Sequence, residues 1–137
     1  MHKVSVIKCN SYDNNEVLKA VEKTIEDIGF EIKPGSTVLL KPNVLMGASP
    51  DKAITTNPAI IDAVCTILNR HKCKILIGES CGFVLKGGVM QAFKEAGIAD
   101  IANKHNAKLV SFNNERLRKV QNNKATFAKE MYLPEIL

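Results

Sequence analysis

The sequence predicts an α/β protein with a Rossmann-like three-layer α/β/α architecture and a mainly parallel sheet of about four or five strands. Two observations lead to this prediction. Short apolar, β-branched segments alternate along the chain with longer segments whose apolar residues recur every three or four positions. The segments expected to be strands are also almost continuously apolar, as strands covered on both faces are. Such alternation is typical of parallel strands joined by right-handed helical crossovers.

The chain opens with a segment that favours a strand and continues into a helix. Residues 4–9 are rich in valine and isoleucine, which favour extended structure. A helix is expected over residues 14–28, because Asp13 can cap its start and the following apolar residues have helical spacing. Gly29 stands where a left-handed C-cap belongs.

A long connection separates the next strand from the next helix. Residues 37–40 read Thr-Val-Leu-Leu and predict the second strand. The connection over residues 41–57 is polar and unusually long for a compact domain. Asn57 is expected to cap a helix with Pro58 at its first position, and apolar residues from 60 to 68 form the buried stripe of that helix.

The second half of the chain repeats the alternation and then ends in a less regular tail. A third strand is expected over residues 74–77, followed by helical patterns over 89–96 and 98–102. Residues 108–112 predict a fourth strand, and the tail over 119–137 is expected to form a hairpin or an edge strand.

Size and composition limit the class of protein. A chain of 137 residues predicts a single domain, residues 1–137. It contains no apolar run long enough to span a membrane and no signal peptide at its N-terminus, so we expect a cytoplasmic location and no membrane partner. The net charge is +5, but the lysines are scattered and aromatic residues make up only 5% of the chain. Nucleic-acid binding is therefore not expected.

The cysteines do not indicate a cofactor. Cys9, Cys65, Cys73 and Cys81 form no CxxC pair and no zinc or iron–sulfur spacing. Cys65 and Cys73 are interpreted as buried structural thiols. Cys9 and Cys81 follow expected strands, where a thiol could act as nucleophile or ligand if its pKa were lowered. The cofactor is left open, with no iron–sulfur cluster motif in this chain.

Polar side chains gather where the second and third strands end. Lys41 and Asn43 follow the second strand, and Glu79 and Ser80 follow the third. Ligands of open α/β sheets bind beyond the carboxyl ends of the strands, so these side chains are expected to share a cleft. The start of the following helix adds three further polar residues, Thr55, Thr56 and Asn57.

The residue types of this cleft allow several roles. Lys41 can bind a phosphate or carboxylate, can act as a base if desolvated, or can be a solvated surface lysine. Glu79 can be a metal ligand, a general base, a ribose acceptor or a solvated strand end. The helix start near Asn57 favours an anion. Lys41 and Glu79 are the candidates for catalytic residues, and Asp51 is a candidate metal ligand or an ordinary turn residue.

Two local patterns match known motifs without their required context. The GESCG segment, residues 78–82, fits the serine nucleophile elbow, but no helix is expected to start directly after its serine. The GFVLKGG segment, residues 82–88, has the glycine spacing of a phosphate-binding loop but lacks its Lys-Ser/Thr pair.

Four motifs together resemble a known family. They are VLLKPNVL (38–45), TTNP (55–58), ILIGESCG (75–82) and FKEAGI (93–98). The combination resembles the bacterial and archaeal family catalogued as domain of unknown function 362. The resemblance implies no settled activity. It implies that many relatives are longer, that some carry a ferredoxin-like module holding cluster cysteines, and that they continue into LKTH-like and KN motifs. This chain is therefore either a short member of the family or the N-terminal part of a longer architecture, and its apolar ending, MYLPEIL, favours the latter.

These observations support three hypotheses about function. The first is a domain that binds an anionic small molecule in the cleft lined by residues 41–57 and 78–82, as part of a larger redox or iron–sulfur-linked enzyme. The second is a non-catalytic docking module for a partner, such as a ferredoxin-like domain or the remainder of the protein. The third is metal-dependent hydrolysis or isomerisation that uses Asp51 and Glu79. Whether the chain is an enzyme is left open.

Overall fold

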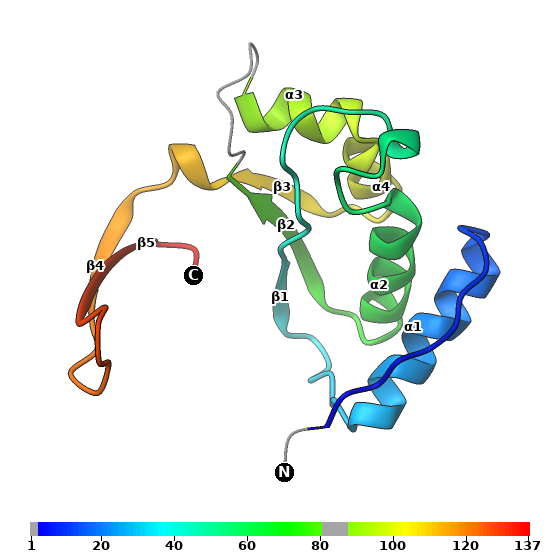
Figure 1. Cartoon of the computed structure of the whole chain (residues 1–137), viewed down its shortest axis with the longest axis horizontal. Helices are drawn as coiled ribbons and strands as arrows, with labels where there is room; N and C mark the ends of the chain where they lie inside the picture. The colour runs from blue at the N-terminus through cyan, green and yellow to red at the C-terminus, as the bar shows by residue number, and fades with distance from the viewer. Residues whose placement is uncertain (1–2, 81–87) are drawn as a thin grey trace.

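The computed structural model describes residues 3–80 and 88–137. The chain traces helices and strands in alternation and ends in a separate two-stranded hairpin (Figure 1). The order is α1 (Asn14–Ile28), β1 (Thr37–Leu40), the 3₁₀ turn η1 (Pro50–Lys52), α2 (Pro58–Arg70), β2 (Lys74–Glu79), α3 (Gly88–Glu95), α4 (Ile98–Lys104), β3 (Lys108–Ser111), the 3₁₀ turn η2 (Phe112–Asn114), β4 (Leu117–Gln121) and β5 (Glu130–Pro134).

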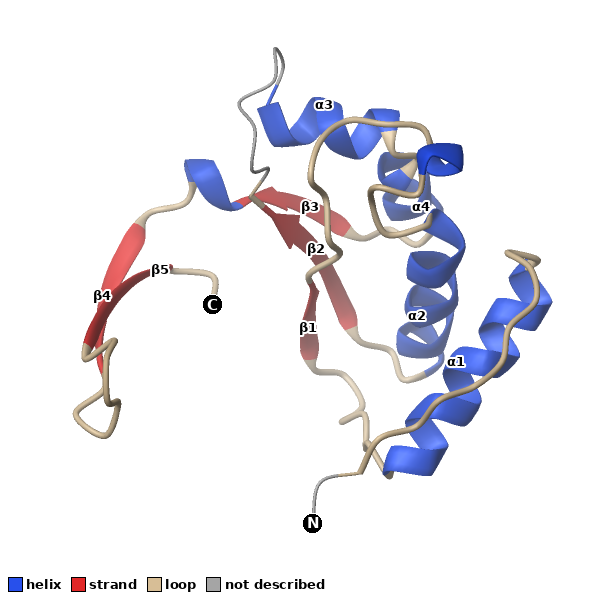
Figure 2. Ribbon diagram, in the orientation of Figure 1, coloured by secondary structure: helices blue, strands red, loops and turns tan. Residues whose placement is uncertain are grey.

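The sheet of the main body has three parallel strands in the order β1-β2-β3. Val38 pairs with Ile75, and Ile77 pairs with both Leu40 and Leu109. Because the spatial order follows the chain order, right-handed crossovers place all the connecting helices on the same face of the sheet. Figure 2 shows this arrangement, with α2 and α4 to one side of the strands and the hairpin to the other.

The core lies between this sheet face and the helices. Its largest fully buried side chains come from β2, α3 and α4, and they are Ile77, Phe93 and Ile98. Partly buried residues of β1 and β3 complete the same cluster. A second, smaller cluster around Val17 joins α1 to the outer face of α2. The helices therefore form two successive layers on one side of the sheet.

Side chains of β3 and η2 lie on the opposite face of the sheet. Val110 and Phe112 are buried there, and the Phe112 ring lies over Gly78 in β2. A Cβ atom at position 78 would lie 2.5 Å from Cε1 of Phe112 and 3.1 Å from Cδ1 of Leu39. Only glycine leaves room for the ring, so the identity of residue 78 follows from this packing.

The helix ends follow the signals in the sequence. The Asp13 carboxylate accepts hydrogen bonds from the backbone N–H groups of Asn15 at 3.0 Å and Glu16 at 3.1 Å. Gly29 ends α1 with φ of 68°, the left-handed conformation that glycine adopts without strain. The predicted helices over 14–28 and from Pro58, and the two over 89–96 and 98–102, are confirmed within a few residues.

The expected first strand is wrong. Residues 4–9 are in no strand, and the side chains of Val4 and Val6 are 87% and 89% exposed. The segment lies on the solvent side of α1, where the Ser5 hydroxyl donates to the Asp27 carboxylate at 2.9 Å. Valine-rich sequence favours extended backbone, but a strand also needs a neighbour to accept its hydrogen bonds.

The overall fold class is α/β, as predicted, but its finer architecture is not confirmed. The parallel sheet has three strands among the described residues, and the antiparallel pair β4–β5 forms a separate sheet. The tail therefore forms the hairpin that was one of its two expected structures. A three-layer arrangement needs helices on both faces of the sheet, whereas the sequential strand order gathers them on one.

Candidate functional site

The ends of β1 and β2 bring Lys41 and Glu79 into contact. The Lys41 ammonium forms an ion pair with Oε2 of Glu79. The lysine side chain is 59% exposed and the glutamate side chain is 6% exposed. Because the strands are parallel neighbours, their exits lie side by side, as the sequence predicted. The lysine is the member of the pair that a ligand can reach.

The second oxygen of Glu79 is also occupied. Oε1 accepts a hydrogen bond from the backbone N–H of Ser80 at 2.9 Å and lies 3.4 Å from the Ser80 hydroxyl. The buried carboxylate therefore has donors on both oxygens, as a buried charge requires. This arrangement fixes the orientation of Glu79 and, through it, the position of the Lys41 ammonium.

The long connection over residues 41–57 is closed at its neck by hydrogen bonds. The Asn43 N–H donates to the Thr56 hydroxyl at 2.9 Å, and the Thr56 N–H donates to the Asn43 carbonyl at 2.9 Å. Val44 and Thr55 form an antiparallel bridge, and the Val44 side chain is buried in the core. The connection is therefore an ordered loop whose two ends are held together beside Lys41.

Two residues at the start of α2 behave differently from one another. The Asn57 side chain accepts from the Ala59 N–H at 2.9 Å, so it caps its own helix. The Thr55 hydroxyl is a buried side-chain oxygen without a hydrogen-bond partner among the described residues. An unpaired buried hydroxyl is energetically unfavourable, and this one is closed off from solvent.

A pocket of about 220 Å³ opens between the end of β1 and the first turns of α2. Lys41 and Thr56 are its polar lining residues, and the rest of its wall is apolar. That apolar wall consists of Leu40, Pro42, Ile60, Ile61 and Val64. Ile60 also lines a neighbouring pocket of about 320 Å³, which includes Cys9, Asn10 and Ser11. The two pockets therefore adjoin.

The structure does not gather all the predicted site residues in one pocket. Lys41 and Thr56 line the smaller pocket, whereas Glu79 and Ser80 lie behind Lys41 and support it. Asn43 contributes main-chain groups to the loop neck. The part of the predicted cleft that falls on residues 81 and 82, including Cys81, lies outside the described residues.

The metal hypothesis finds no support in the geometry. Asp51 is exposed on η1 and lies 3.5 Å from the Lys52 ammonium. Within residues 3–80 and 88–137, no three His, Cys, Asp or Glu side chains are placed to hold a metal ion together. Asp51 is a turn residue in this structure, which was the simpler of its two interpretations.

Sequence reasoning missed a second polar cluster, which is buried between α2 and α4. Asp62 accepts hydrogen bonds from Nζ of Lys104 at 2.8 and 2.9 Å and from Nε2 of His105 at 2.6 Å. Nδ1 of His105 lies 2.9 Å from the amide nitrogen of Asn69. The Asn69 contact engages Nδ1, and Nε2 faces the Asp62 carboxylate. Asp62 lies three residues before buried Cys65 on the same helix. This helical spacing was the signal from which the burial of Asp62 could have been predicted.

The electrostatics of this cluster keep Asp62 ionised. Burial raises the pKa of the Asp62 carboxyl, but the hydrogen bonds from Lys104 and His105 and their charges outweigh it, so the net pKa is lowered. The side chains of Asp62 and His105 are each 8% exposed. Both ring nitrogens of His105 are engaged, so the cluster is organised to join two helices.

The fold and the strand-end geometry define the chain as an α/β domain with a Lys41–Glu79 ion pair at the carboxyl edge of a parallel sheet. Residues 38–137 match the family described as domain of unknown function (DUF362), and the chain belongs to this family. The resemblance seen in the sequence is therefore confirmed.

The chain is also similar to a curated protein whose name states an association and no activity. The chain is 32% identical over 91 residues to a thylakoid-associated protein of Synechocystis sp., and the match covers 64% of this chain. The chain spans only 28% of that relative's length. No solved structure matches the chain significantly. No helix of the described residues has the length and apolar character needed to cross a bilayer.

Proposed function

We propose that this domain binds a small anionic molecule in the pocket at the carboxyl edge of its sheet. The observation that carries the proposal is the Lys41–Glu79 pair, in which a buried carboxylate holds an accessible ammonium at the mouth of a pocket. A phosphate or carboxylate at this place would contact Lys41 and the Thr56 hydroxyl. The apolar wall of the pocket would accept the body of the ligand.

The start of α2 favours a negatively charged ligand. Free backbone N–H groups and the helix dipole make such a start favourable for anions, and Thr56 stands directly before its cap. The Thr55 hydroxyl is buried and does not line the pocket, so it is not one of the proposed ligand contacts. The residues that touch the ligand are Lys41 and Thr56. The other polar residues hold the loop and the side chains of the site in place, and they are Asn43, Asn57 and Ser80.

The test is binding of defined anions to the described domain and to matched variants. Inorganic phosphate and a panel of small mono- and dicarboxylates serve as probes. Their binding is measured by thermal shift and by NMR titration. Lys41→Met should weaken binding on the order of tenfold or more, because a hydrogen bond to a charged group is lost. Lys52→Met is the matched control, since Lys52 is an exposed lysine of the same loop outside the pocket.

The outcomes separate the site from general attraction to a basic protein. Equal binding by the wild type and Lys41→Met would refute the proposal, as would equal losses in both lysine variants. Glu79→Gln keeps the size of the side chain and removes its charge, so the Lys41 ammonium loses its support. We expect Glu79→Gln to weaken phosphate binding less than Lys41→Met does.

In a longer protein, this pocket would form one wall of a larger site. We infer that the larger protein is a redox or iron–sulfur-linked enzyme, in which this domain supplies the anion contact. The inference depends on the family resemblance together with the share of the relative that this chain spans. Coexpression of this domain with the remaining segments of a full-length relative, followed by copurification and iron analysis, tests it.

A second candidate function is a non-catalytic docking module, and one observation favours it. The β4–β5 hairpin contributes no residue to either hydrophobic cluster of the described chain, and Leu117 and Tyr132 on it are exposed. An isolated hairpin is marginally stable in water, so a partner domain would stabilise it. Chemical-shift changes confined to the hairpin on addition of a ferredoxin-like domain would support docking, and unchanged shifts would refute it.

A further inference from the structure

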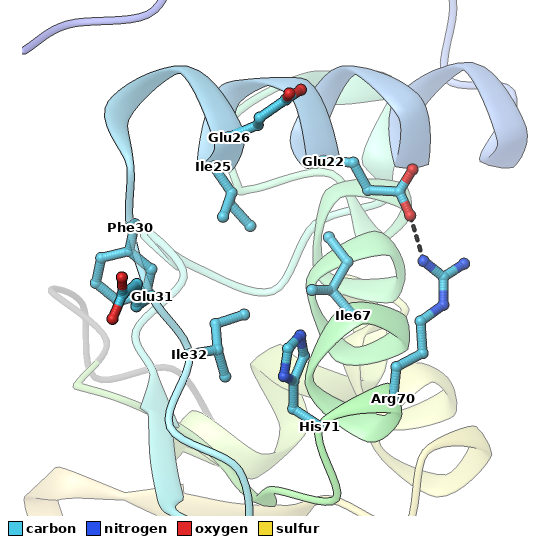
Figure 3. A pocket seen from close by; sticks show the side chains of 9 residues that line it. All are labelled: Glu22, Ile25, Glu26, Phe30, Glu31, Ile32, Ile67, Arg70 and His71. Carbon is cyan, nitrogen blue, oxygen red and sulfur yellow. Dashed lines mark hydrogen bonds and ion pairs between the residues drawn. The ribbon is translucent and has the colours of Figure 1, made fainter.

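A groove separate from the strand-end site lies between α1 and the last turn of α2. It has a volume of about 510 Å³. Figure 3 shows three isoleucines, Ile25, Ile32 and Ile67, directed towards its centre. Phe30 forms one side and is 62% exposed. Such an apolar floor is a surface that a buried side chain of a partner would cover.

The rim of this groove carries three glutamates and one arginine: Arg70 forms an ion pair with Glu22, and His71 also lines the groove. Glu26 and Glu31 stand on it, and Glu31 has no ion-pair partner within the part of the chain that the structure describes. Lys23 lies 3.3 Å from Glu26 but pairs more closely with Asp27, at 2.7 Å. The rim therefore keeps a negative charge above an apolar floor.

Two distant regions of the chain differ in the sign of their charge. Residues 13–31, which include α1 and one side of the groove, contain six acidic and two basic residues. Residues 116–129, which form β4 and the tip of the hairpin, contain five basic residues and no acidic one. The protein is basic overall, so this acidic region stands out as a candidate surface for a basic partner.

The tip of the hairpin has the matching chemistry. Phe127 is 95% exposed there, and it lies between the exposed residues Lys124 and Lys129. A large aromatic side chain that is left in water on a protruding turn is unfavourable, and such residues are typical anchors of protein interfaces. The tip therefore offers one apolar anchor flanked by two positive charges.

We propose that the hairpin tip of one molecule docks in the α1–α2 groove of a second copy. Phe127 covers the isoleucine floor, and Lys124 and Lys129 face Glu26 and Glu31. Figure 1 shows the hairpin and α1 on opposite sides of the sheet, so a tip meets the groove of another molecule and not its own. The contact is head-to-tail, and it produces a ring or a chain of molecules.

This self-association uses a surface that the proposed anion site does not share. The groove lies at the end of α2 that leads into β2, whereas Lys41 and Thr56 lie at the end of β1 and the start of α2. Because the contact combines opposite charges on exposed side chains, added salt weakens it. Failure of anion binding therefore leaves this inference standing, and the reverse also holds.

The test is the oligomeric state of the whole chain, measured by light scattering and sedimentation up to about 1 mM protein at low salt. Wild type should associate reversibly, and Phe127→Ala should weaken the association on the order of tenfold or more. Val6→Ala is the matched control, since Val6 is an equally exposed apolar residue outside both surfaces. Phe127→Ala removes a side chain that packs on nothing, so folding is expected to be unaffected.

Charge reversal identifies the groove as the receiving surface. Glu26→Lys with Glu31→Lys should weaken association, and so should Lys124→Glu with Lys129→Glu. A mixture of these two double variants contains one restored contact and should form heterodimers. A wild-type chain that stays monomeric overturns the proposal. Association that is insensitive to the Glu26/Glu31 reversal also overturns it, because the tip then binds elsewhere or another partner is its natural occupant.

Discussion

Replacing Asp62 by alanine should destabilise the domain by removing the centre of the α2–α4 cluster. The change leaves Nε2 of His105 without its acceptor in a site where the ring is 8% exposed. Breaking a buried ion pair costs about 3–5 kcal/mol. The Lys104 side chain is 56% exposed and can be rehydrated, so we expect a smaller loss of about 2–3 kcal/mol.

The expected shift in melting temperature follows from the size of the chain. A domain of 137 residues has an unfolding entropy of about 0.3 kcal/mol/K, so this loss corresponds to a decrease of roughly 7–10 °C. Urea denaturation followed by circular dichroism gives the free energy, and calorimetry gives the melting temperature. Lys104→Met should cost less than about 1 kcal/mol, because its ammonium remains largely in water.

The dependence of stability on pH tests whether the ionised Asp62 carboxylate is the source of the stabilisation. The pKa of Asp62 is lowered in the folded protein, so its contribution is present above the unfolded pKa of about 3.9 and is lost as the pH falls further. The stability difference between wild type and Asp62→Asn should therefore narrow below about pH 4. Asp51→Ala is the control, since Asp51 is an exposed turn residue. An Asp62→Ala variant within about 0.5 kcal/mol of wild type would contradict the reasoning.

Two further predictions concern packing and reactivity. Gly78→Ala should destabilise the domain by about 1–3 kcal/mol in urea denaturation, because the new methyl group meets the Phe112 ring. Adding Phe112→Leu should recover part of this loss, and strictly additive effects would refute the contact. Burial and the Asp62 charge raise the pKa of Cys65 to about 11, so native protein near pH 8 should be alkylated at exposed Cys9 and protected at Cys65. Mass spectrometry of peptides checks this, and equal labelling of the two thiols would contradict it.

Local signals explain why the helices could be predicted from the sequence. Asp13 and Gly29 bound α1, and Asn57 with Pro58 opens α2, by contacts made within a few residues. The segment over residues 4–9 shows the limit of such signals. Its composition favours extended backbone, but strand formation depends on a distant neighbour that no local pattern specifies.

The candidate site likewise has features that could be predicted from the sequence and features that could not. The proximity of Lys41 and Glu79 could be predicted, because parallel strands end at a common edge. The spatial order of the strands could not be predicted from the sequence. This order places the helices on one face of the sheet. The Asp62–His105 contact also joins residues far apart in the chain, and neither residue type nor spacing shows which partner a buried carboxylate will meet.

The loop after β1 is closed at its neck, so the length of the loop can change without moving the site residues at its two ends. Val44, Thr55 and the mutual bonds of Asn43 and Thr56 fix both ends of the excursion independently of its middle. Adding residues to a loop that is already closed costs little free energy, since the closure entropy grows only slowly with length. Relatives can therefore lengthen or shorten the stretch over 48–53 during evolution while the lysine and threonine keep their places.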